Sequence, residues 1–140
     1  MIKKIFNILI ITFFLPNFLL AKSEYYTVGV DLYKKNKFED AKFKFEQDIV
    51  YNPKRELSYL YLAKIFHKQD KTNLEEQNLK TVILLNPKNE EAIYDLAKLK
   101  LSSSDYQKSK ELNFKLKSIC INFCEKSDDL KVEIENLLKK

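Results

Sequence analysis

The chain contains little of what β-rich folds and nucleotide-binding loops require. Its 140 residues include one glycine, three prolines and no tryptophan. An all-β fold needs Gly, Pro and Asn-Gly turns every few residues, so this composition argues against one. A single glycine also excludes glycine-rich phosphate loops and dinucleotide-binding fingerprints. The abundant Lys, Glu, Leu and Ile favour helices, and we expect one all-α domain.

Groups that carry catalytic chemistry are scarce too. The only histidine is His67, so a Ser-His-Asp or Cys-His arrangement would have to be built on it. Adjacent acids such as Glu75-Glu76 do not face one site together on a helix, and predicted helix starts already account for them. The two cysteines have no further pair of ligands at the spacing of a zinc site. We predict that the protein is not an enzyme and has no cofactor and no metal site.

The sequence also lacks a run of charge of one sign. The formal net charge is +5, and Lys3 and Lys4 fall in a segment that we expect to be removed, which leaves 5 − 2 = +3. The other lysines are scattered among glutamates, whereas a nucleic-acid-binding domain shows a clustered basic stripe. We therefore expect solvated helix faces and no nucleic-acid partner.

Residues 1–21 have the pattern of a secretory signal peptide. Two lysines near the start precede an apolar stretch, and Ala21 is a small residue at the join. Pro16-Asn17 interrupts the stretch before it reaches the ~20 apolar residues that a spanning helix needs. We expect cleavage between Ala21 and Lys22, with retention as a single N-terminal membrane anchor as the alternative. A composition rich in Lys, Asn, Ile, Phe and Tyr is typical of an AT-rich bacterial genome and points to the periplasm.

The tripeptide Asn-Pro-Lys occurs at residues 52–54 and again 34 residues later, at 86–88. Proline biases the preceding residue away from the helical region, so each copy predicts a helix boundary. Other residues recur at the same period. The first copy has Tyr25, Val28, Gly29, Leu32, Ala41, Phe45 and Pro53, the second has Tyr59, Leu62, Ala63, Phe66, Leu79 and Pro87, and the third has Ile93, Leu96, Ala97 and Tyr106.

This pattern resembles the tetratricopeptide repeat, whose 34-residue helix hairpin carries aromatic, Leu-Gly, Ala, Phe and Pro residues at set spacings. The resemblance covers nearly all of residues 23–121 and weakens towards the C-terminus, as expected of a terminal repeat. It implies an all-α, right-handed α-α superhelix in which three helix hairpins precede a C-terminal capping helix. Within a domain of residues 22–140, the repeats would span about 22–55, 56–89 and 90–123, and the capping helix about 127–139, opened by Ser127.

Local signals predict where the helices start and where they pack closely. Asn36, Thr72 and Ser104 each precede Glu or Gln by three residues, which is a capping-box pattern for the second helix of each hairpin. Asn89 would open the third hairpin. Gly29 in mid-helix costs about 1 kcal/mol relative to Ala, so we expect the backbone of a second helix close to it.

Cys120 and Cys124 flank the position where the third repeat should have its proline. A lone pair in an oxidising compartment is usually joined, although on an unbroken helix cysteines four residues apart are too far apart for an unstrained bridge. The predicted turn at 121–126 would let the sulfurs meet. A disulfide, two buried free thiols and a redox or metal site all remain open from the sequence.

The resemblance implies a concave groove, lined by the first helix of each hairpin, that binds an extended or helical peptide. Transferred to this sequence, its residues are Tyr26, Val30, Tyr33, Leu60, Lys64, His67, Tyr94, Lys98 and Leu101. Aromatic rings beside lysines suit a peptide with apolar anchors and some acidic groups. Co-chaperone members of the family grip a C-terminal carboxylate with basic and amide residues. The matching places here are Tyr26, Val30, Tyr61, Glu91 and Asp95, so that activity is rejected.

These observations lead to a non-enzymatic function. The main hypothesis is an exported adaptor that binds a peptide segment of another envelope protein in its groove. The alternative is a structural subunit of an envelope complex that uses its convex face and touches the membrane only through an uncleaved N-terminus. An enzyme or redox protein that depends on the cysteine pair is the third and weakest reading.

Overall fold

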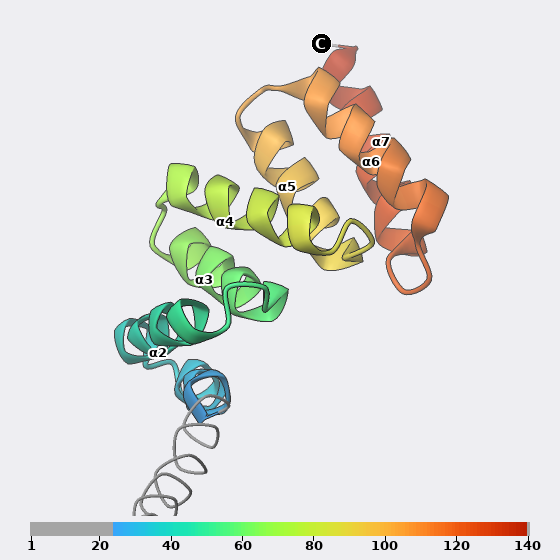
Figure 1. Ribbon diagram of the computed structural model, residues 1–140. Coiled ribbons are helices and arrows are strands. Elements are labelled where there is room, and N and C mark those ends of the chain that lie inside the picture. Colours follow the sequence, from blue (N-terminus) through green and yellow to red (C-terminus); the bar gives the residue numbers. More distant parts are fainter. Residues whose placement is uncertain (1–23, 140) are drawn as a thin grey trace, which may run out of the picture. The chain divides into compact units, whose positions relative to one another are not determined.

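The computed structural model describes residues 24–139, and every regular element among them is an α-helix (Figure 1). The predicted signal segment, with Ala21 and Lys22, lies outside the described residues. Residues 24–34 are helical. Six helices follow: α2 (Phe38–Tyr51), α3 (Glu56–Lys68), α4 (Thr72–Leu85), α5 (Glu90–Ser102), α6 (Tyr106–Ile119) and α7 (Cys124–Leu138). No helix in this described part is both long and apolar enough to cross a membrane.

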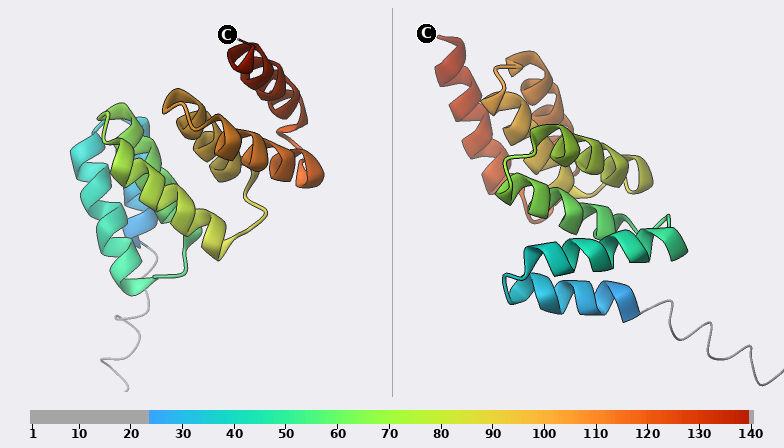
Figure 2. Two further views of the ribbon diagram at one scale, coloured as in Figure 1. Left: turned by 90° about the horizontal axis from the view of Figure 1, so that it is seen from above. Right: turned by 90° about the vertical axis from the view of Figure 1, so that its left-hand side faces the viewer.

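The chain divides into two compact units after Lys54. In the first unit, the helix of residues 24–34 is followed by α2. The second unit contains α3 to α7, in which α3 packs on α4, α4 on α5, α5 on α6 and α6 on α7. The views in Figure 2 show α3 and α4, and likewise α5 and α6, as neighbouring helices joined by short turns.

The helix starts repeat every 34 residues. Thr72 and Tyr106 begin α4 and α6 one and two periods after the start of α2, and Glu90 and Cys124 begin α5 and α7 one and two periods after the start of α3. Helix α7 therefore holds the place of the first helix of a fourth hairpin. The predicted start of the capping helix at Ser127 is wrong by three residues. Ser127 is buried, and its hydroxyl donates to Asn113 Oδ1 at 2.9 Å instead of capping a helix.

The turns inside the hairpins also follow this period, because Asn36, Asp70 and Ser104 all have a left-handed backbone with φ of 58°, 55° and 63°. In the first turn, the amide of Lys37 donates to the carbonyl of Leu32 at 2.9 Å, which is a Schellman-type helix end. The two later turns repeat that hydrogen bond, from Lys71 to Phe66 and from Asp105 to Lys100.

This geometry corrects the predicted capping boxes. Asn36 and Ser104 lie one residue before the N-cap of their helices, in the left-handed position that Asn and polar residues tolerate better than bulky ones. Thr72 is the first helical residue rather than the cap. The prediction for Asn89 is confirmed, because its side chain accepts a hydrogen bond from the Ala92 amide at 2.9 Å.

Gly29 explains the tight packing of the first unit. A Cβ atom at this position would lie 2.8 Å from Cε1 of Phe45, which is fully buried. The sequence predicts a close neighbour from the second helix, and the neighbour is this aromatic side chain of α2 rather than backbone. The only glycine of the chain therefore lies where the hairpin has no room for a side chain.

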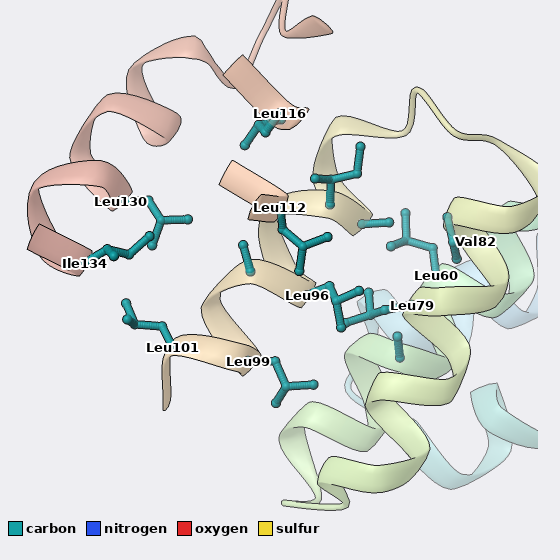
Figure 3. Packing of buried hydrophobic residues seen from close by; sticks show 14 residues of the cluster. Leu60, Leu79, Val82, Leu96, Leu99, Leu101, Leu112, Leu116, Leu130 and Ile134 are labelled. Carbon is teal, nitrogen blue, oxygen red and sulfur yellow. The ribbon is translucent and has the colours of Figure 1, made fainter. Parts of the chain in front are cut away.

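One continuous core holds the second unit together (Figure 3). Its leucines and isoleucines come from all five helices, and Ile93, Leu116 and Leu130 are among the largest fully buried side chains. Two polar residues occupy the register position that Ala41 holds in the first repeat. Glu75 is 6% exposed there, and Ser109 is fully buried and donates to the carbonyl of Ala97 at 2.8 Å.

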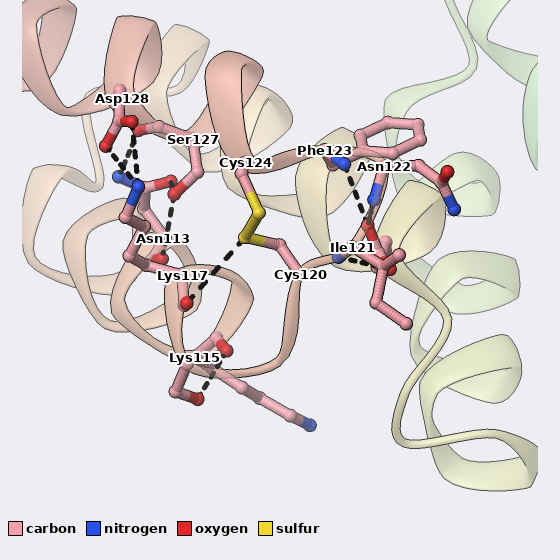
Figure 4. The surroundings of a disulfide bond; sticks show 12 residues. Asn113, Lys115, Lys117, Cys120, Ile121, Asn122, Phe123, Cys124, Ser127 and Asp128 are labelled. Atoms are coloured by element: carbon pink, nitrogen blue, oxygen red, sulfur yellow. Dashed lines mark hydrogen bonds and ion pairs between the residues drawn. A yellow bond between two sulfur atoms is a disulfide. The ribbon is translucent and has the colours of Figure 1, made fainter.

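The junction before α7 is built around the cysteine pair (Figure 4). Cys120 and Cys124 are joined by a disulfide, with 5.2 Å between their Cα atoms. Cys120 lies one period after Asn86 and, like it, ends a helix with an extended backbone. The disulfide thus closes the third inter-repeat turn, where the first two have proline.

Glu90, the first residue of α5, fixes the loop that the disulfide closes. Its carboxylate accepts hydrogen bonds from the three backbone amides of residues 121–123 at 2.8 to 2.9 Å. Desolvation acts to raise the pKa of Glu90, but these three hydrogen bonds outweigh it and lower the pKa below its ordinary value. The loop therefore attaches the start of α7 to the start of α5.

We expect the Cys120→Ser/Cys124→Ser variant to lose about 2 kcal/mol of unfolding free energy, because a five-residue loop is no longer closed in the unfolded chain. Urea unfolding of the oxidised wild type and the variant measures the difference. Thiol titration of the denatured, unreduced protein is the control. Two reactive thiols in protein produced in an oxidising compartment would contradict the disulfide.

Candidate functional site

The predicted groove residues of the first unit share one helix face. Tyr26, Val30 and Tyr33 are half-buried and recur at helical spacing within residues 24–34. Their rings also contribute to packing, since Tyr26 lies 6.1 Å from the ring of Phe45 and Tyr33 lies edge-on to Phe38 at 5.4 Å. Only part of each tyrosine ring on this helix face is therefore accessible to a peptide.

In the second unit, two of the predicted groove residues belong to the core. Leu60 is 3% exposed and Leu101 is 5% exposed, and both lie within the main hydrophobic cluster. The prediction that they line an open groove is wrong. The 34-residue register assigns them to a helix face, but it does not show how deeply neighbouring helices cover that face.

Residues of α7 and of the turn just before it contact the next two predicted groove residues, Tyr94 and Lys98. The ring of Tyr94 lies edge-on to Phe123 at 5.7 Å, and Lys126 Nζ lies 5.4 Å from the Tyr94 ring centroid. Lys98 Nζ lies 2.6 Å from a carboxylate oxygen of Glu133 on α7. This part of α5 therefore supports the last helix and has less surface to offer a peptide.

Lys64 and His67 lie at the surface of α3, beside α4 and α5. Lys64 Nζ forms an ion pair with Glu91 of α5 at 2.7 Å and lies 5.3 Å from the ring centroid of Tyr61. The His67 side chain is 73% exposed, and its Nδ1 atom lies 3.0 Å from Oε1 of the buried Glu75 on α4. Polar groups of three helices therefore meet here.

Asp95 of α5 completes this group and has the most perturbed acidity in it. Burial raises the pKa of Asp95 from its ordinary value of 3.8 to about 6. This value already includes the smaller upward effects of Glu91 and Glu75 on the pKa and the opposing effects of Lys64 and His67. We call the five residues Lys64, His67, Glu75, Glu91 and Asp95 the α3–α5 site.

The α3–α5 site carries more negative than positive charge. Three carboxylates face one lysine and a histidine, and Lys64 is already paired with Glu91. Lys98 is likewise paired with Glu133. The lysines from which an acidic ligand was expected are therefore neutralised by the protein itself. No group of three or more His, Cys, Asp or Glu side chains among the described residues could hold a metal ion.

Sequence reasoning missed Glu75, Glu91 and Asp95 as members of a site. The sequence patterns place Glu91 at a helix start, Glu91 and Asp95 at mismatched positions of a carboxylate clamp, and Glu75 in a predicted capping box. The signal was present in the sequence, because Glu91 and Asp95 are four residues apart on one predicted helix. Like charges at that spacing repel each other, so they require a local reason.

Comparison with solved structures identifies the fold. The type III secretion chaperone SycD of Yersinia enterocolitica, in complex with a peptide of the translocator YopD, matches with a TM-score of 0.73 and 18% identity, over 84% of this chain and 93% of that one. The TPR2B domain of yeast Sti1 in complex with an Hsp70 peptide matches with a TM-score of 0.76 and 14% identity, over 84% and 98% of the chains.

A third match is the first TPR domain of Spaghetti (RPAP3) bound to an HSP90 peptide, with a TM-score of 0.74 and 15% identity, over 83% of this chain and 91% of that one. No protein-family model matches the sequence, and no curated protein matches it significantly. The predicted all-α helical-repeat architecture is confirmed. The chain has a tetratricopeptide-repeat fold.

Proposed function

We propose that this chain is a non-enzymatic interaction module, an exported adaptor that binds a peptide segment of an envelope protein at the α3–α5 site. The observation that carries the proposal is Asp95, a largely buried carboxylate that the fold keeps beside two other acids. Such an arrangement costs stability, and groups of this kind are concentrated at functional sites. The fold supports the proposal, since three solved structures of this fold hold peptides of other proteins.

The charges of the site define the peptide that it fits. The site favours a lysine or arginine on the partner beside Asp95, because its one lysine, Lys64, faces three carboxylates and is already paired with Glu91. Tyr61, half-buried beneath Lys64, offers an aromatic surface for an apolar anchor next to that basic residue. We therefore propose a peptide with apolar anchors and a basic group in place of the acidic groups expected from the lysines alone.

Binding should depend on Asp95 and Tyr61. We expect Asp95→Asn and Tyr61→Ala each to weaken peptide binding about tenfold, because truncation of a hot-spot residue at the centre of an interface costs more than about 1 kcal/mol. The partner is first captured from an envelope extract and identified, and the affinities of the variants for it are then measured by titration calorimetry.

Leu84→Ser is the matched control, because Leu84 is 80% exposed on α4 and outside the α3–α5 site. Its affinity should equal that of the wild type. A partner that binds all three variants with unchanged affinity would show that another surface is used, and the α3–α5 site would be rejected.

Export is part of the proposal and rests on the pattern of residues 1–21. We expect the mature protein to begin at Lys22 and to be recovered from the periplasm. N-terminal sequencing of the protein from a fractionated bacterial host tests this. A chain that still begins at Met1 in the inner-membrane fraction would favour the membrane-anchored structural subunit instead.

A further inference from the structure

A second candidate surface, which shares no residue with the α3–α5 site, lies on helices α6 and α7. A cavity of about 230 Å³ opens between them, and its lining is mostly apolar. Ile134 and Leu138 of α7 and Phe114 of α6 contribute the apolar surface, and Asn113 also lines the cavity. We call this hollow the α6–α7 groove.

Phe114 makes the groove unusual for the end of a repeat array. Its side chain is 79% exposed, and Leu138 beside it is 54% exposed. The terminal repeats of such arrays normally present a polar outer face, which keeps them soluble. An apolar groove here is therefore a surface that a protein can cover.

Hydrogen bonds and an ion pair join α6 and α7 along the groove. The side-chain amide of Asn113 donates to the backbone carbonyl of Ser127 at 2.9 Å, and the Ser127 hydroxyl donates to Asn113 Oδ1. Lys117 and Asp128 form an ion pair at 2.7 Å where α6 and α7 approach the disulfide loop. The α6–α7 groove is therefore preformed, so binding there has no additional free-energy cost for opening it.

We infer that the α6–α7 groove is the interface between two copies of this chain. The surface has both halves of a self-complementary contact, since the exposed ring of Phe114 lies beside a hollow lined by Ile134 and Leu138. In a two-fold pair, each copy meets the same patch of the other, so each Phe114 ring enters the other copy's hollow.

The charges on the rim fit this arrangement. Lys110 has no charged partner among the described residues, and Glu135 is held only loosely, with 3.9 Å to Lys131 Nζ. The rim thus carries both signs of charge. In the dimer that we infer, the Lys110 of each copy is placed opposite the Glu135 of the other, an arrangement that favours a second copy over a ligand of one charge.

The test is the concentration dependence of the molecular mass. The full chain is expressed in an exporting host, and the purified protein is measured by sedimentation equilibrium from low micromolar to millimolar concentration. We expect a reversible monomer–dimer equilibrium. Phe114→Ser should raise the dissociation constant at least about tenfold, as expected for an aromatic anchor at the centre of an interface. Leu84→Ser, a change at an equally exposed residue, should leave it unchanged.

Exchanging the charges of Lys110 and Glu135 distinguishes a dimer formed through the α6–α7 groove from a dimer formed through another surface. Lys110→Glu and Glu135→Lys should each weaken the dimer, and the double variant should restore it, because both changes then meet across the two-fold axis. Circular dichroism of each variant checks that the fold is kept. A protein that is monomeric at every concentration overturns the inference. A dimer indifferent to Phe114→Ser, or a groove occupied instead by a foreign helix, overturns it as well.

Discussion

Asp95→Asn is expected to raise the free energy of unfolding by about 1–3 kcal/mol at pH 7. The upper figure follows from a pKa raised from 3.8 to about 6, since each tenfold change in proton affinity corresponds to about 1.4 kcal/mol. Asparagine keeps the shape of the side chain and removes the charge that burial disfavours. We expect less than the full value, because relaxation around the site compensates part of the cost.

The pH dependence of this effect has a definite sign. The folded protein holds the Asp95 proton more tightly than the unfolded chain does. Below about pH 4 Asp95 is protonated in the folded protein, and the wild type is then not destabilised relative to Asp95→Asn. It loses stability relative to Asp95→Asn as the pH rises from about 4 to about 6, and the difference is constant above that range. Urea unfolding at pH 4 and at pH 7 measures both limits.

Asp129→Asn is a matched control, since it removes an exposed carboxylate from α7. It should change stability by less than about 0.5 kcal/mol at either pH. If Asp95→Asn were neutral or destabilising at pH 7, the carboxylate would not be strained, and the argument that it is kept for binding would fail. A variant that is more stable but binds the partner less tightly is the outcome expected of a functional residue.

Phe45→Ala should cause the largest loss of stability, about 3–5 kcal/mol, the usual range for truncating a buried aromatic ring. The Phe45 side chain is fully buried and fills the space that Gly29 leaves open. Differential scanning calorimetry and urea unfolding measure the loss. A loss below about 1 kcal/mol would show that the first hairpin is not packed as described.

Gly29→Ala provides a sharper test of the same contact. In the wild type the new Cβ atom would meet the Phe45 ring at 2.8 Å, and we expect overpacking to cost about 1–3 kcal/mol, reduced by up to about 1 kcal/mol of gained helix propensity. In the Phe45→Ala background the clash is absent, so Gly29→Ala should be neutral or stabilising. Additive effects in the two backgrounds would contradict the contact.

The sequence predicts the fold well because its signals are local and periodic. The Asn-Pro-Lys copies, Gly29 and the recurrent small residues each fix one step of the 34-residue repeat. The helix caps were less predictable, since a polar residue such as Ser104 serves equally in a left-handed turn or as a cap. The start of α7 was misassigned for a related reason. The Glu90 carboxylate, distant in sequence, binds the amides before that helix.

The candidate site was predictable only in part. The register assigns Lys64, His67, Leu60 and Leu101 to one groove. Leu60 and Leu101 are buried, because burial depends on how closely adjacent helices approach, whereas a groove role for Lys64 and His67 stays a prediction. The importance of Asp95 arises from burial together with charges on three helices. A spacing rule within one helix does not contain that information.

Site-specific photocrosslinking tests the central claim most directly. A photoreactive phenylalanine analogue replaces His67 in one variant and Leu84 in another, since both side chains are well exposed but only His67 belongs to the α3–α5 site. After irradiation of intact cells, we expect a covalent adduct with one envelope protein from position 67 and none from position 84. An adduct from position 84 alone, or none from position 67, would contradict peptide binding at the α3–α5 site.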